Sequence, residues 1–87
     1  MKNIKEIANK IVEFERMESE YANVILNYEI VKEKYKLSDE EMEKLIDAFW
    51  DNEHVADCYL EEHGLYGVEI NITFWTDSCP EYTYKEY

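Results

Sequence analysis

Residues 37–50, LSDEEMEKLIDAFW, contain the clearest local signal for secondary structure in the chain. Ser38 is a residue type that caps the free amides at the start of a helix, and Glu41, three positions later, can reach back to the Ser38 amide as in a capping box. Leu37 can pack against Met42 as a hydrophobic staple. The apolar residues that follow recur at helical spacing. They are Met42, Leu45, Ile46, Phe49 and Trp50. The segment predicts a capped helix over residues 39–51 with these side chains buried.

The residues before this helix are also expected to be helical. The first 63 residues contain neither Gly nor Pro. Apolar residues at the start of the chain recur at steps of three and four, as in an amphipathic helix. They are Ile4, Ile7, Ile11 and Phe14. The same spacing resumes over residues 21–35, so one long helix and two helices broken near Ser19 both fit. Residues 22–30 also alternate like a strand and are rich in β-favouring types, but the continued helical phase favours a helix.

The pattern changes after residue 52. Residues 53–63 fit either a helix that ends at Gly64 or a strand, and residues 68–74 alternate with period two, as a half-buried strand does. The side chains expected on its buried face are Val68, Ile70, Ile72 and Phe74. Residues 76–80 are typical of a turn. The alternation at Tyr82 and Tyr84 then predicts a returning antiparallel strand. We therefore expect one α+β domain, residues 1–87, with helices followed by a small antiparallel sheet or hairpin.

The composition is that of a small acidic domain. The chain is 46% apolar and contains two Trp, three Phe and eight Tyr, which is too apolar and aromatic for intrinsic disorder. Twenty-one acids against nine bases give a net charge of −12. Residues 1–36 hold seven acids and seven bases, whereas residues 37–87 hold fourteen acids and two bases and therefore the whole net charge. This charge argues against binding to nucleic acid or to an anionic membrane and favours a basic protein as partner.

The chain shows no targeting signal that would place it outside the cytoplasm. Its first residues, MKNIK, are not followed by the continuous apolar segment of a secretion signal. No apolar run approaches the roughly 20 residues of a membrane helix. We expect a cytoplasmic protein in which Cys58 and Cys79 are reduced thiols.

Neither a metal site nor a catalytic centre is expected. Four residues have the types and number required for zinc: His54, Cys58, His63 and Cys79. The closely spaced Cys pairs of structural zinc sites are missing, however. A Cys, a His and an acid occur together by chance in so short a chain, and no nucleophile elbow or Gly-rich loop accompanies them. We therefore predict a protein without cofactors or metal that is not an enzyme.

A row of acids on the 39–51 helix is the candidate partner-binding site. Its members step by three, four and four positions, opposite the apolar face: Glu40, Glu43, Asp47 and Asp51. Neighbours on such a row lie about 5–6 Å apart and repel one another, with only Lys44 close enough to relieve them. The row is expected to continue through Asp57, Glu61 and Glu62. The alternative is a solvated face that keeps the protein soluble. Crowded like charges lower the stability of the fold, however, and this loss is smallest when a basic partner neutralises them.

Two tyrosines in the same acidic half are further candidates for the interface. Tyr82 and Tyr84 offer large contact area with a hydrogen-bonding tip, and Tyr is enriched at protein interfaces for this reason. The alternative is that both side chains simply cover one face of the sheet.

In size, charge, aromatic content and lack of catalytic motifs, the chain resembles the small acidic inhibitors carried by bacteriophages and mobile elements. Anti-CRISPR proteins and other DNA mimics belong to this class. The resemblance implies an inhibitor, monomeric or homodimeric, that binds a basic nucleic-acid-binding host protein. Such a target is a CRISPR effector or a similar defence nuclease, whose DNA or RNA site the inhibitor would block. The resemblance assigns no role to individual residues.

Two other functions are kept as alternatives. Residues 38–49 are similar to an acidic helix of the nuclease-colicin immunity proteins, which would imply an immunity protein that neutralises a nuclease toxin. Those proteins are all-helical, and the strand pattern at 68–74 departs from them. The third function is a metal-dependent small regulator that uses the two His and two Cys residues.

Overall fold

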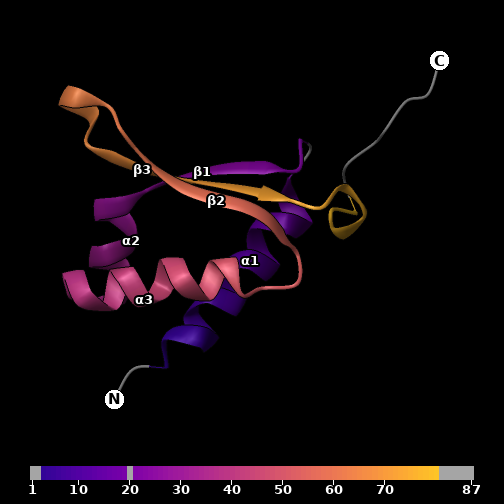
Figure 1. Cartoon of the computed structure of the whole chain (residues 1–87), viewed down its shortest axis with the longest axis horizontal. Helices are drawn as coiled ribbons and strands as arrows, with labels where there is room; N and C mark the ends of the chain where they lie inside the picture. The colour runs from indigo at the N-terminus through magenta and orange to yellow at the C-terminus, as the bar shows by residue number, and fades with distance from the viewer. Residues whose placement is uncertain (1–2, 20, 81–87) are drawn as a thin grey trace.

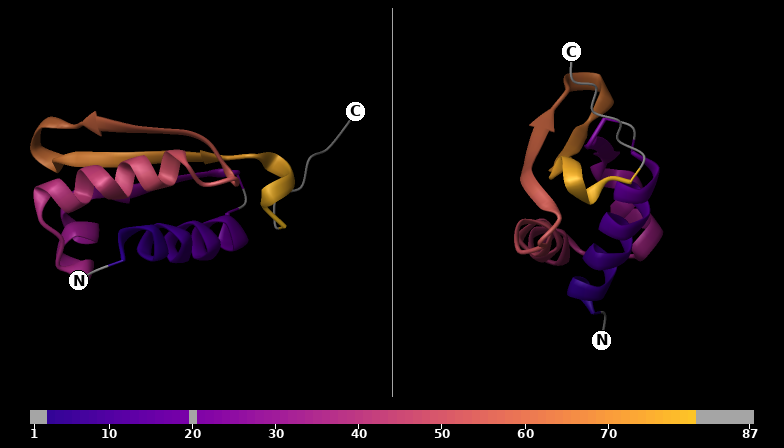
Figure 2. Two further views of the ribbon diagram at one scale, coloured as in Figure 1. Left: turned by 60° about the horizontal axis from the view of Figure 1, so that its bottom comes forward. Right: turned by 90° about the vertical axis from the view of Figure 1, so that its right-hand side faces the viewer.

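The computed structural model describes residues 3–19 and 21–80 and has the expected α+β architecture (Figure 1). Its elements, in chain order, are α1 (Ile4–Glu18), β1 (Asn23–Asn27), α2 (Tyr28–Tyr35), α3 (Asp39–Trp50), β2 (Val55–Glu62) and β3 (Val68–Phe74). Single turns of 3₁₀ helix follow β2 (Gly64–Tyr66) and β3 (Thr76–Ser78). The strands form an antiparallel sheet in the order β1-β3-β2. The helices lie together on one face of this sheet (Figure 2).

The helical prediction for residues 21–36 is wrong for β1, and the strand alternative is correct there. The helix breaks near Ser19, because α1 ends at Glu18 and its C-cap Ser19 is already extended (φ −81°, ψ 124°). Ala22 has a positive φ of 55°, and β1 then pairs with β3 from Asn23↔Thr73 to Asn27↔Glu69. The helical part of the prediction holds only for α2. Asn27 caps that helix by accepting the Ile30 amide. Pairing with a strand far away in the sequence therefore overrides the local helical phase.

Helix α3 begins as predicted, with both hydrogen bonds of a capping box. The Ser38 hydroxyl accepts the Glu41 amide at 3.1 Å, and the Glu41 carboxylate accepts the Ser38 amide at 2.9 Å. Met42, Leu45 and Phe49 are fully buried, but Trp50 is 50% exposed, so its expected place in the core is wrong. Trp50 lies at the edge of the apolar stripe at the end of the helix, where the elements of the described part of the chain cover only half of its surface.

The apolar face of α1 is narrower than the spacing suggests. Its buried residues are Ala8, Ile11 and Val12. Phe14, which the spacing places on the same stripe, is 64% exposed. The reason is that β1 and α2 leave an open groove beside this part of α1.

The C-terminal half contains the two strands that complete the sheet. The open choice for residues 53–63 is resolved as strand β2, and the strand predicted over residues 68–74 is β3. Ile70, Ile72 and Phe74 are buried as expected. Asn71 points to the other face but is only 5% exposed, because β3 is the central strand and has neighbours on both sides. The predicted strand at Tyr82 and Tyr84 lies outside the described residues.

The core is formed between the sheet and the helix layer. Its largest fully buried side chains are Phe49, Phe74, Met42, Leu45, Ile70, Ile72, Val12 and Cys58. Both cysteines are free thiols. Among the helices of the described part, none has the length and apolar content needed to cross a membrane.

Candidate protein-binding surface

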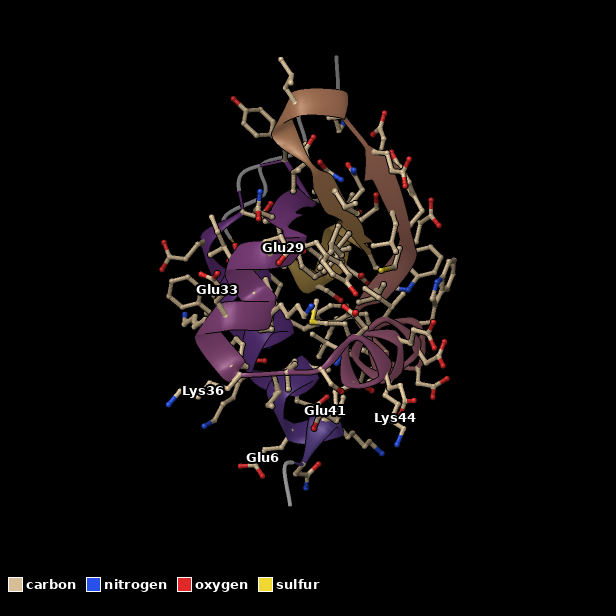
Figure 3. All side chains as sticks on the ribbon, turned by 90° about the vertical axis from the view of Figure 1, so that its left-hand side faces the viewer. Glu6, Glu29, Glu33, Lys36, Glu41 and Lys44 are labelled. Atoms are coloured by element: carbon tan, nitrogen blue, oxygen red, sulfur yellow. The ribbon has the colours of Figure 1, made fainter. Side chains whose placement is uncertain are left out.

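Helix α3 carries the predicted acidic row on its solvent side. The four side chains are exposed, while the opposite side of the helix packs into the core. They are Glu40, Glu43, Asp47 and Asp51. Within residues 3–19 and 21–80, none of the four makes a side-chain hydrogen bond or an ion pair. Lys44 points away from the sheet, at the end of the molecule that also carries Glu41 (Figure 3). The row is thus a line of four carboxylates on successive turns of one helix.

The nearest described ion pair lies at the start of α3, outside this row. The Lys32 ammonium is 2.7 Å from the Asp39 carboxylate and joins α2 to α3. The hydrogen bond to Asp39 raises the pKa of Lys32, with a smaller contribution from the negative charge of Glu29. Because the Asp39 side chain is 79% exposed, solvent screens this pair and it is worth little stability. Its effect is to occupy Lys32 with Asp39, so the cations that remain near the row are Lys44 and Lys5, which line a depression together with Asp47 and Asp51.

The strand β2 divides the other three predicted acids between its two faces. Successive side chains of a strand point in opposite directions. Glu62 points to the same face as Cys58, toward the helix layer, and lies beside Glu43 and Asp47. Asp57 and Glu61 point to the open face of the sheet, where Glu61 is paired in register with Glu69. The structure therefore brings Glu62 to the α3 row and separates Asp57 and Glu61 from it. Tyr82 and Tyr84 lie outside the described residues.

An open groove of about 560 Å³ runs between α3 and the β2–β3 hairpin, and we call it the acidic groove. Its apolar lining comes from three elements: Met42, Ile46, Leu60 and Val68. Its polar lining is Tyr28, Glu43, Asp47 and Glu62. Burial raises the pKa of the Tyr28 hydroxyl, and the negative charge of Asp39 raises it further. The acidic row is therefore bordered by an apolar depression rather than by a flat polar surface.

A second open groove, of about 450 Å³, lies between α1, β1 and α2, and we call it the neutral groove. Phe14, Ile25 and Ile30 line it and are each more than half exposed. Its charged lining residues are Lys10, Lys34 and Glu15. Burial raises the pKa of Glu15, and the positive charge of Lys34 partly offsets this effect. Reasoning from the sequence missed this surface, because it placed Phe14 in the core and did not place β1 beside α1.

The His and Cys residues do not assemble into a metal site. No group of three or more His, Cys, Asp or Glu side chains in the described part of the chain is arranged to hold a metal ion. His54 is hydrogen-bonded to the Ser78 hydroxyl at 2.9 Å, and His63 lies 2.7 Å from the Glu69 carboxylate. Cys58 and Cys79 are both buried.

The two thiols also lack the environment of an activated nucleophile. Burial, with the negative charge of Asp57, raises the pKa of Cys58 to about 11. Burial raises the pKa of Cys79 as well, although the positive charge of Arg16 opposes this shift. Reactive cysteines instead have a lowered pKa, because the thiolate is the nucleophile. These thiols are therefore core residues in an environment that disfavours the thiolate.

Comparison of the chain with protein-family models, with curated proteins and with solved structures found no match. The basis for a function is therefore the surface chemistry of the chain itself.

Proposed function

We propose that this protein is an acidic inhibitor that binds a basic, nucleic-acid-binding host protein and occupies the site where DNA or RNA would lie. The target class is a CRISPR effector or a similar defence nuclease in the cytoplasm. The observation that carries the proposal is the row of exposed carboxylates on α3 without a partner in the described residues. The inhibitor acts by occupying a surface, not by catalysis.

The row presents a line of negative charge, as a phosphate backbone does. Neighbouring members lie about 5–6 Å apart on a helix, a wider spacing than the one charge per roughly 3.4 Å of each strand of duplex DNA. Carboxylates accept the same charge-assisted hydrogen bonds from Arg and Lys that phosphates accept. The whole net charge of −12 belongs to residues 37–87, so the long-range field also directs a basic partner to this half.

Charge reversal at matched positions tests the proposal. Glu43→Lys with Asp47→Lys reverses two row members four positions apart. The control is Glu29→Lys with Glu33→Lys, which changes the net charge equally at two exposed positions, also four apart, on α2 (Figure 3). Each protein is immobilised and exposed to a bacterial lysate that contains defence systems. We expect the control to capture the same partner as the wild type, and the row variant to lose it.

The outcomes separate a defined site from bulk charge. Equal loss in both variants would mean that net charge alone drives capture, and equal retention would mean that the row is only a solvated face. Circular dichroism and urea unfolding establish that both variants are folded. The identity of the captured protein distinguishes a defence effector from a nuclease toxin, which would favour the immunity alternative.

A further inference from the structure

On the basis of the proposed function, we infer that the acidic groove is the docking site for one amphipathic basic segment of the partner. This segment presents Arg or Lys beside apolar side chains. A pure substitute for a phosphate backbone needs only charge, whereas the acidic groove combines charge with an apolar depression.

Three of the four apolar lining residues are accessible to a partner, whereas the fourth, Met42, is fully buried. Leu60 points toward the helix layer, yet it is 47% exposed. The strand β2 is an edge strand, and its burial pattern is exposed throughout after Cys58. Ile46 and Val68 are half-buried beside it. An apolar depression next to a polar rim is typical of a protein-binding surface.

The charged lining determines the charge of the segment that can bind in the groove. In the part of the chain that the structure describes, Glu43, Asp47 and Glu62 have no ion-pair partner. A purely apolar segment would remove water from these carboxylates without replacing their hydrogen bonds, which is costly. An acidic segment would be repelled. The guanidinium of Arg, in contrast, binds a carboxylate through two parallel hydrogen bonds, while its aliphatic stem covers apolar surface.

The neutral groove provides an internal control. It has a similar volume and an exposed apolar lining, but Lys10 and Lys34 replace the row of carboxylates. A basic amphipathic segment should therefore select the acidic groove on charge, since the apolar content of the two surfaces is comparable.

Two synthetic peptides provide the test. One is a helical peptide of Leu and Arg with the Leu residues along one face, and the other has the same composition in scrambled order, so that charge and apolar content are equal. Binding is followed by fluorescence anisotropy and by NMR amide shifts of the full chain. We expect the amphipathic peptide to bind about tenfold more tightly, and the shifts to gather around Ile46, Leu60 and Val68.

A matched pair of variants locates the site. Leu60→Gln should remove the preference for the amphipathic peptide, whereas Ile30→Gln, an equally polar change at a 64%-exposed position of the neutral groove, should retain it. Equal binding of both peptides, shifts at the neutral groove, or an unchanged preference in Leu60→Gln would each overturn the inference. Such a result would leave the proposed function standing if Glu43→Lys with Asp47→Lys still abolished lysate capture. The proposed function would be refuted, and the inference would survive, if the amphipathic peptide still preferred the acidic groove but the partner captured from lysate bound no nucleic acid.

Discussion

The two grooves of this protein are alike in size and apolar lining but differ in charge. The neutral groove, between α1, β1 and α2, carries two lysines and one glutamate, whereas the acidic groove, between α3 and the β2–β3 hairpin, carries three carboxylates. The acidic groove also borders the rest of the α3 row. The charge asymmetry of the sequence therefore falls on a surface with a defined shape, and the neutral groove serves as a control for experiments on that surface.

The largest effect should come from a pair of identical substitutions in the two regions. Phe49→Ala removes a fully buried ring from the core side of α3 and should cost about 3–5 kcal/mol. Phe14→Ala removes a 64%-exposed ring from the neutral groove and should cost less than about 1 kcal/mol. Urea unfolding measures both. Equal losses would show that Phe14 belongs to the core, as the helical spacing alone suggests, and that the neutral groove is closed.

The next effect concerns the thiol of Cys58, on the strand that borders the acidic groove. Its pKa rises from an ordinary value of 9 to about 11, so its thiolate population near pH 8 should fall about a hundredfold. The rate of alkylation by iodoacetamide, followed by mass spectrometry, should fall by at least this factor relative to the urea-unfolded chain. The folded state holds the proton more tightly, so the associated stability is present below pH 9 and is lost as the pH rises toward 11. Comparable alkylation rates in the folded and unfolded chains would contradict the burial and the raised pKa of Cys58.

Helix capping should have a smaller and similar effect in both regions. Ser38→Ala removes the hydroxyl that accepts the Glu41 amide at the start of α3, and Asn27→Ala removes the corresponding cap of α2. Each should cost about 1 kcal/mol in urea unfolding. An unchanged unfolding curve for Ser38→Ala would mean that the capping box does not stabilise the helix that carries the row.

The smallest effect should be that of salt on stability. Repulsion between neighbours on the row costs a few tenths of a kcal/mol per pair, and salt screens exposed charges. Raising NaCl from about 20 mM to about 500 mM should therefore increase the Tm of the wild type slightly. Glu43→Lys with Asp47→Lys should reduce this gain, and Glu29→Lys with Glu33→Lys should not. A gain that is equal in all three proteins would place the repulsion elsewhere.

The elements with a local signal were predictable from the sequence, and those that depend on distant pairing were not. The capping box at Ser38 and Glu41 specifies the start of α3, and strict alternation specifies β3. Strand β1 has a helix-like pattern and becomes a strand because β3, more than forty positions later, pairs with it. Trp50 fits the apolar stripe of α3, but only the packing within residues 3–19 and 21–80 shows that it is half exposed.

The candidate site also combines features that have a local sequence signal with features that depend on contacts between distant segments. The row on α3 lies on one helix face and could be read from spacing alone. The position of Glu62 beside Glu43 and Asp47 could not, because it depends on which face of β2 each residue occupies, and β2 has an irregular register between Val55 and Asp57. The neutral groove combines three elements and the acidic groove combines four, so neither groove could be predicted without the fold.

The most direct test asks whether this protein and nucleic acid compete for the same site. The partner captured from lysate is purified, and its binding to a labelled DNA or RNA oligonucleotide is measured by anisotropy while the inhibitor is added. We predict that a stoichiometric amount of wild-type protein displaces the oligonucleotide, that Glu29→Lys with Glu33→Lys does so equally, and that Glu43→Lys with Asp47→Lys does not. If the partner instead holds the oligonucleotide and this protein at the same time, the α3 row does not occupy the nucleic-acid site, and the proposed function is wrong.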